Sequence, residues 1–110
     1  ISHLGNPFHQ ELTEIVKENS QVYSDISGLV HSKYKRDTRY EPEEVSEAVE
    51  NIKQFLGECG PSKLLFGTDF QLQIHSDSIY FIEEAMKNYP LTDKKKVYYK
   101  NAERILEGRD

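Results

Sequence analysis

Three polar residues of this sequence could carry chemistry, and each lies in or directly after a segment with the pattern of a β-strand. His3 follows the opening residues, Asp25 lies within an alternating segment, and Asp69 follows an apolar run. An aspartate can ligate a cation and accept a proton from an attacking water, and a neutral imidazole can ligate a metal or polarise a carbonyl. His3 and Asp69 are therefore the candidate catalytic and metal-binding residues.

Each of these residues also has a structural interpretation. Asp69 follows a Gly-Thr step, where an aspartate often caps a helix or closes a turn. A single histidine such as His3 is commonly part of the packing. Asp25 can make a structural hydrogen bond as readily as it can hold a site. The spacing of the residues leaves these alternatives open.

The segments that must position these residues alternate between strand and helix. The opening residues have the pattern of the second half of a strand, and further strands are expected at residues 21–28 and 63–66. Apolar residues at helical spacing predict helices at residues 8–19, 42–59, 76–89 and 92–106, with N-caps at Ser76 and Thr92. Such alternation implies a parallel sheet whose functional groups gather at the carboxyl ends of its strands. We therefore expect one α/β domain over residues 1–110, with three parallel strands and about four helices.

The segment from residue 31 to residue 41 is polar, basic and without periodicity, so we expect a loop there. It is longer than most connections, and loops of that length often carry function. Its basic side chains could attract a carboxylate or a phosphate. We name His31 and Arg36 as candidate substrate-binding residues, with an ordinary surface loop as the alternative.

The composition excludes several classes of partner. The net charge is −5, and no cluster of Lys and Arg outweighs its acidic surroundings, which argues against a nucleic-acid partner. The run Lys94-Lys95-Lys96 is expected to lie on a solvated helical turn. No apolar run approaches the roughly 18 residues that cross a bilayer, so no membrane partner is expected.

The single cysteine, Cys59, ends an apolar helical stripe and is expected to be a buried free thiol. This cysteine usage suits a reducing cytoplasm, where we expect the protein to reside. The chain opens at Ile1, without a methionine or a leader, and we expect it to be part of a longer protein.

Four segments of the sequence, taken in order, resemble the last part of amidohydrolase-family barrels. Residues 1–7 (ISHLGNP) are similar to the segment at strand six, and residues 23–28 (YSDISG) to strand seven. Residues 64–70 (LLFGTDF) resemble the segment at strand eight. Residues 101–106 (NAERIL) look like the closing helix. The resemblance covers essentially the whole chain.

The resemblance implies part of a TIM (β/α)₈ barrel and a metal-dependent hydrolase with a small-molecule substrate. Asp69 matches the strand-eight aspartate, which ligates the metal and shuttles the proton of the attacking water. His3 matches the strand-six histidine, which ligates a second metal or polarises substrate or water. Asn101 matches an asparagine that ties the last helix to the barrel. The implied cofactor is a divalent metal, zinc above all, and the implied reaction is hydrolysis of a C–N or C–O bond, or a related decarboxylation.

The sequence departs from the family pattern where other ligands are expected. The His-x-His pair of strand one and the histidine of strand five are absent, and Gln71 stands where the family often has proline. A single-metal site needs about four ligands, so we expect the chain alone to be inactive. Three strands also cannot close a barrel, and their unpaired edges favour further pairing. We expect an open α/β sandwich, a homo-oligomer or completion by a missing N-terminal part.

Two other functions fit the same order of elements. The first is a non-catalytic α/β domain that uses the inherited fold for self-association or for binding a partner. The second is a small response-regulator-like domain, although the acidic pair expected after its first strand is absent.

Overall fold

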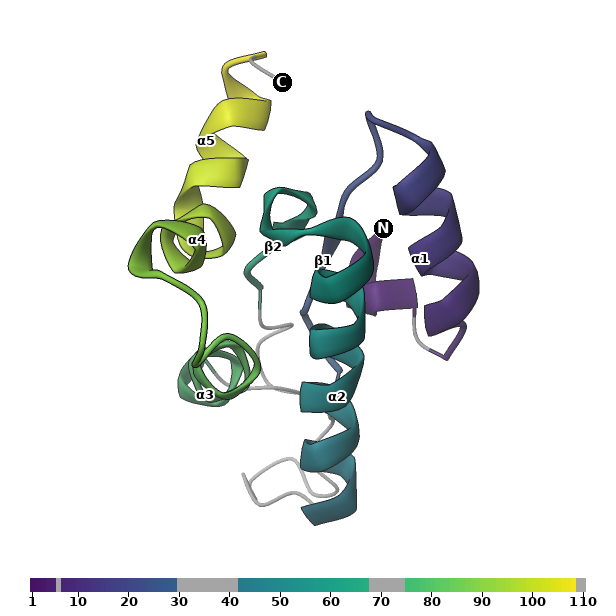
Figure 1. Ribbon diagram of the computed structural model, residues 1–110, viewed down its shortest axis with the longest axis vertical. Helices are drawn as coiled ribbons and strands as arrows, with labels where there is room; N and C mark the ends of the chain where they lie inside the picture. The colour runs from purple at the N-terminus through teal and green to yellow at the C-terminus, as the bar shows by residue number, and fades with distance from the viewer. Residues whose placement is uncertain (6, 30–41, 68–74, 109–110) are drawn as a thin grey trace.

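Two short parallel strands run side by side in the middle of the molecule (Figure 1), in a computed structural model that describes residues 1–5, 7–29, 42–67 and 75–108. Strand β1 (Ser24–Asp25) pairs with β2 (Leu64–Leu65), with Ser24 opposite Leu64. Helix α2 (Pro42–Cys59) precedes β2 and belongs to the crossover that a parallel pair requires.

The first residue extends this pairing on the other side of β1. The amino group of Ile1 donates to the carbonyl of Tyr23 at 2.6 Å, and the Ile1 carbonyl accepts from the N–H of Asp25 at 3.1 Å. This is the hydrogen-bond pattern of a parallel pair. It does not continue, because Ser2–Gly5 form a 3₁₀ helix.

The prediction of a strand through the opening residues is therefore wrong beyond Ile1. The backbone turns there because the N–H of His3 bonds to the side chain of Asp25 and Leu4 is drawn into the core. The described residues form two strands, so three parallel strands and a barrel are not confirmed. The α/β character and the parallel pairing are observed.

The first two predicted helices lie close to their expected positions. They are α1 (His9–Glu18) and α2 (Pro42–Cys59). Helix α3 (His75–Ala85) begins one residue before Ser76 and ends earlier than predicted. The last predicted helix consists of α4 (Leu91–Lys95), a π-helical turn (Lys96–Lys100) and α5 (Asn101–Leu106). It starts at Leu91 after Pro90, so Thr92 lies inside the first turn and is not its N-cap.

The π-helical turn connects the last helix to the edge of β2. The N–H of Asn101 donates to the carbonyl of Lys96, five residues back, which leaves the Val97 carbonyl without its helical donor. That carbonyl instead accepts from the N–H of Phe66 at 3.1 Å. The helix thus satisfies a backbone group that would otherwise lie unpaired just beyond β2.

The side chain of Asn101 makes the same connection from inside the core. It is fully buried, and its Nδ2 donates to the carbonyls of Pro61 at 2.7 Å and Leu64 at 2.8 Å. Its Oδ1 accepts from Arg104 at 3.0 Å. The structure therefore agrees with the expectation that Asn101 ties the last helix to the sheet.

The core lies where the helices cover the two strands. Its buried residues come from every major element, and the fully buried large ones are Leu4, Val16, Ile26, Ile52, Phe55, Leu64, Phe81, Ile82, Met86 and Val97. Each of the predicted helical stripes contributes to this set. None of the described helices is both long and apolar enough to span a bilayer.

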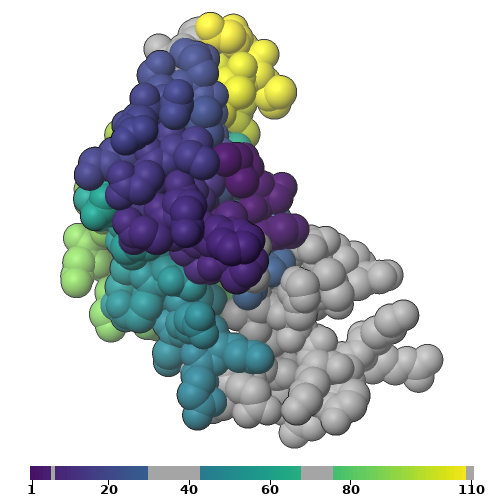
Figure 2. Space-filling view, turned by 90° about the vertical axis from the view of Figure 1, so that its right-hand side faces the viewer, coloured from purple at the N-terminus to yellow at the C-terminus, as the bar shows by residue number. Residues whose placement is uncertain are grey.

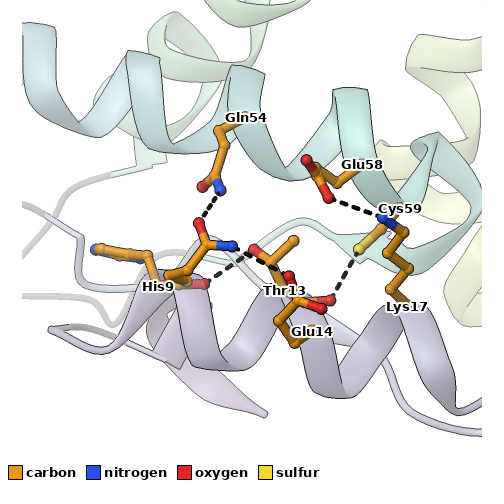
Figure 3. A network of polar contacts seen from close by, with 8 residues as sticks. His9, Thr13, Glu14, Lys17, Gln54, Glu58 and Cys59 are labelled. Atoms are coloured by element: carbon orange, nitrogen blue, oxygen red, sulfur yellow. Dashed lines mark hydrogen bonds and ion pairs between the residues drawn. The ribbon is translucent and has the colours of Figure 1, made fainter.

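Polar contacts link α1 to α2 along one side of the molecule (Figure 3). Lys17 pairs with Glu58 at 3.2 Å, and the Sγ of Cys59 donates to the carbonyl of Thr13 at 3.6 Å. Burial raises the pKa of the Cys59 thiol above its usual value. Cys59 is half-buried and free of disulfide bonds, so the predicted free thiol is observed and its burial is partial.

Candidate active site

His3 lies in the strained turn Ser2–Gly5. The N-terminal segment that contains this turn, purple in the figures, lies beside α1 in Figure 1 and on the face that Figure 2 shows. The backbone angles of His3 are φ 60° and ψ 28°, and Leu4 follows with φ 49°. A side-chain-bearing residue rarely adopts this left-handed conformation, and such strain persists only where the surroundings hold it. Here the buried side chain of Leu4 and the hydrogen bond from His3 N–H to Asp25 hold it in place.

The imidazole of His3 is held by Ser27. Its Nδ1 lies 2.5 Å from the carbonyl oxygen and 3.2 Å from the Oγ of that residue. A carbonyl oxygen can only accept, so Nδ1 carries the proton in this contact. In the neutral ring Nε2 then presents its lone pair, and no described residue bonds to it. This is the tautomer that ligation of a metal through Nε2 requires.

Asp25 binds both His3 and Ser27. Its Oδ1 accepts from the His3 N–H at 3.1 Å, the Ser27 N–H at 3.0 Å and the Ser27 hydroxyl at 2.6 Å. Because the hydroxyl donates to Asp25, its oxygen is left to accept from Nδ1 of His3. One carboxylate oxygen therefore orients both the backbone and, through Ser27, the ring of the histidine. Asp25 was expected either to make a structural hydrogen bond or to hold the site. Its hydrogen bonds do both, because they orient the candidate ligand His3.

The carboxyl end of β2 lies beside Ser27, the residue that holds His3. Gly67 and Ser27 each lie two residues beyond the last residue of their strands, as expected for the same end of a parallel pair. A Cβ on Gly67 would lie 3.3 Å from the Cβ of Ser27, which is tighter than most such contacts. The glycine therefore allows the two strand ends to approach closely beside His3.

The other predicted site residues are not placed by the structure. Asp69, His31 and Arg36 all lie outside the described residues. His3 is brought together with Asp25 and Ser27, as the sharing of one sheet end predicted, and its relation to Asp69 stays a prediction.

The described side chains do not build a metal site by themselves. Within residues 1–5, 7–29, 42–67 and 75–108, no three His, Cys, Asp or Glu residues stand close enough to hold an ion. A zinc site takes at least three protein ligands. His3 fits as one ligand through Nε2, and the others have to come from elsewhere.

One acidic residue of α3, Asp77, was not singled out from the sequence. The Oδ2 of Asp77, in the first turn of α3, is buried and has no hydrogen-bond partner in the described part of the chain. A buried carboxylate oxygen without a partner is costly, so such an atom marks a place where a further group is expected. Its position in a helical first turn gives no signal in the sequence, because acidic residues are common there.

His9 shows that the tautomer alone does not define a site. Its Nδ1 contacts the carbonyl of Leu4 at 2.9 Å, the same kind of contact that His3 makes. His9 belongs to the first turn of α1, however, and its ring is held by Leu4 rather than by Ser27. The distinguishing feature of His3 is its place at the carboxyl end of the parallel pair.

The sequence also matches a known protein family. The amidohydrolase family model matches residues 1–108 of the 110 residues. Neither curated proteins nor solved structures give a match. The match covers nearly the whole sequence, including the strand ends that carry His3 and Gly67, and the chain therefore belongs to the amidohydrolase family.

Proposed function

We propose that this chain contributes His3 and Asp69 to the active site of a divalent-metal-dependent amidohydrolase with a small-molecule substrate. The reaction is hydrolysis of a C–N or C–O bond, or a related decarboxylation. The observation that carries this proposal is the contact between Nδ1 of His3 and the Ser27 carbonyl, which leaves Nε2 as a lone-pair donor at the carboxyl end of the strands.

The tautomer favours one of the two roles expected for His3. Polarising a substrate carbonyl takes an N–H donor, and the Nδ1–H is already engaged with Ser27. Nε2 can instead ligate a cation. We therefore assign His3 as a ligand, and it would act as an electrophile only if the ring were doubly protonated.

Asp69 is proposed as a second ligand and as the base that accepts the proton of the attacking water. It follows Gly67 by two residues, and two residues of extended chain span at most about 7 Å. Gly67 in turn adjoins Ser27, the residue that holds His3. A divalent ion such as zinc, bound by these residues, would supply Lewis-acid activation of water.

The remaining ligands are proposed to come from outside this set of residues. His3 is the one candidate ligand at this end of the described strands, and about four ligands complete a zinc site. We propose that a second copy of the chain or an N-terminal part of the protein supplies them. The segment with His31 and Arg36 is proposed to contact the substrate.

Cobalt(II) is a suitable probe, because its paramagnetism broadens the NMR signals of a ligating ring even when binding is weak. We expect the His3 ring signals to broaden first on titration. Replacing His3 with Asn keeps an N–H donor near the Nδ1 position and removes Nε2. Because the variant has no ring signals, the readout is the amide of Ser27, which contacts His3, and its broadening by cobalt should be lost while the fold is kept. The same substitution at His9 is the matched control and should leave the His3 response unchanged.

Equal broadening of His3 and His9 would contradict the proposal, as would an unchanged response in Asp69→Asn. Under the alternative function, self-association without catalysis, the chain would form an oligomer on size measurement and His3→Asn would have no effect on cobalt binding. The alternative is favoured only by the small number of candidate ligands in the described residues.

A further inference from the structure

Two basic residues line a pocket at the amino ends of the strands, opposite the end that holds His3. Lys63, which precedes β2, and Arg104, on α5, face it together with Ser20, Gln21, Tyr23 and Ser62. The pocket has a volume of about 530 Å³. Figure 1 shows α5, the turn before β2 and the segment after α1 gathered at this end of the molecule.

Lys63 is held in position by neutral groups. Its Nζ donates to the carbonyls of Asn19, at 3.4 Å, and Ser20, and lies 4.5 Å from the centre of the Tyr23 ring. These contacts orient the ammonium group, and the ring attracts a cation weakly. None of them carries a full negative charge that would neutralise Lys63.

Arg104 is oriented in the same way. One terminal nitrogen donates to Oδ1 of Asn101 at 3.0 Å, and the other donates to the Ser62 carbonyl at 2.9 Å. A guanidinium has five N–H donors, so several remain after these two bonds. Both acceptors are neutral, so neither of these bonds balances the charge of Arg104.

Other lysines of the chain are paired with acids. Lys17 pairs with Glu58, Lys94 with Glu83 and Lys96 with Asp93, all within 4 Å. The predicted solvated run at residues 94–96 is thus partly neutralised by neighbours. By contrast, Lys63 and Arg104 are half-buried and have no carboxylate partner in the described part of the chain. In a chain of net charge −5, two cations without a carboxylate partner among the described residues are notable.

Arg104 also borders a second pocket with further positive charge. This pocket has a volume of about 430 Å³ and is lined by Thr92, Lys95, Lys96, Lys100, Glu103 and Arg104. Positive side chains gathered around a concavity raise the local concentration of anions. Lys96 and Lys100 of this pocket are paired with Asp93 and Glu103, so Arg104 is the cation that the two pockets share without a carboxylate partner among the described residues.

We propose that the pocket between Lys63 and Arg104 binds an oxyanion, the phosphate or carboxylate group of a small molecule. An oxyanion there would accept charge-assisted hydrogen bonds from both side chains, and Ser62 lines the same pocket. The site is separate from the proposed catalytic end, so it does not depend on the function proposed above. It is a second ligand site at the amino end of the sheet.

The test is an NMR titration of the chain with sodium phosphate and sodium acetate, against sodium chloride at equal ionic strength. We expect saturable shifts of the Arg104 Nε–H and the Lys63 amide, with the His3 ring unchanged. Lys63→Gln should weaken binding roughly tenfold, the effect of losing about one charge-assisted hydrogen bond. Saturable shifts with phosphate but not with acetate would identify a phosphate site. Saturable shifts with each of the two anions would identify a general oxyanion site.

The matched control is Lys100→Gln, which removes the same charge from the neighbouring pocket. It should change affinity by less than about twofold, because exposed charges act through screened, long-range attraction. Arg104→Lys keeps the charge and loses the planar fork, and it should weaken phosphate binding while circular dichroism confirms the fold. Equal losses in Lys63→Gln and Lys100→Gln, or shifts that follow ionic strength alone, would overturn the proposal.

Discussion

The carbonyl oxygen of Ser27 lies 2.5 Å from Nδ1 of His3, and this contact joins residues that are 24 positions apart in the chain. It fixes the protonated nitrogen of the ring and thereby the nitrogen that is left to bind a ligand. The contact depends on a turn in which His3 and Leu4 have left-handed backbones. Whatever holds that turn also holds the candidate ligand.

Asp25 is the residue that holds it, so Asp25→Ala should destabilise the chain and release His3. One carboxylate oxygen accepts three hydrogen bonds, and losing them leaves three donors without their acceptor. We expect a loss of about 3 kcal/mol in the free energy of unfolding, measured by urea denaturation. Asp25→Asn keeps an acceptor oxygen and should cost less than the alanine variant. Equal stability of wild type and Asp25→Ala would show that the turn does not depend on this carboxylate.

Gly5 closes the same turn and should not tolerate a side chain. Its φ is +70°, and a Cβ there would lie 2.6 Å from the Cβ of Leu12. Gly5→Ala combines backbone strain with a clash and should cost about 3 kcal/mol or more on thermal or urea unfolding.

Gly60 separates these two effects. It also has a positive φ, +83°, but nothing lies within 4 Å of its Cβ position. Gly60→Ala should therefore cost only about 1 kcal/mol, from the backbone alone. If Gly5→Ala and Gly60→Ala were equally stable, the predicted clash between residue 5 and Leu12 would not contribute to the loss of stability.

Much of the candidate site could be expected from the sequence. Parallel strands place their carboxyl ends together, and this logic brought His3 to Asp25 and Ser27 and placed Gly67 beside them. The apolar stripes likewise located α1 and α2 within a residue or so of their observed ends. These features follow from local periodicity and from one general rule of topology.

The features that were missed depend on contacts between distant residues. The left-handed turn at His3 forms because Asp25 supplies an acceptor, and the π-helical turn forms where Phe66 needs one from Val97. The basic pocket joins Lys63 to Arg104, which lie far apart in sequence and on different elements. No local pattern encodes such pairs, because the two partners are far apart in the sequence and neither residue alone signals the other.

Asn101 should be among the most sensitive positions outside the site. Its fully buried amide satisfies the carbonyls of Pro61 and Leu64, and its removal leaves both without this donor. Asn101→Ala should lower the free energy of unfolding by about 3 kcal/mol, with an added cavity term. Ala102→Ser, at the exposed neighbouring position, is the control and should change stability little. A small effect of Asn101→Ala would mean that water replaces the amide at both carbonyls.

Cys59 should react slowly with thiol reagents at neutral pH. Burial raises the pKa of its thiol, and the thiolate is the reactive form. We expect alkylation by iodoacetamide to be at least several-fold slower in the folded chain than in urea. Thr13 holds the sulfur through its backbone, so Thr13→Ser is a control that should leave the rate unchanged. Equal rates in folded and unfolded chains would contradict the partial burial of Cys59.

Tyr98 should make the fold sensitive to alkaline pH in a defined range. Burial, with the nearby Glu83, raises its pKa to about 12 from an ordinary value of 10.0. Between these two values the unfolded chain loses the phenolic proton that the folded chain keeps. The contribution of Tyr98 to stability is therefore complete below about pH 10 and is lost as the pH rises through 12. Phenolate absorbance of the folded wild type should contain a late-titrating component that Tyr98→Phe lacks.

The variant Tyr98→Phe isolates this effect from the other groups that titrate at high pH. It removes the hydroxyl that donates to Glu83 at 3.2 Å, so it should lose less stability than the wild type between pH 10 and 12. Tyr99→Phe, on an exposed neighbour, should keep the wild-type pH profile. If Tyr98→Phe and the wild type lost stability in parallel over this range, the ring of Tyr98 would have to ionise as freely in the folded chain as in the unfolded one.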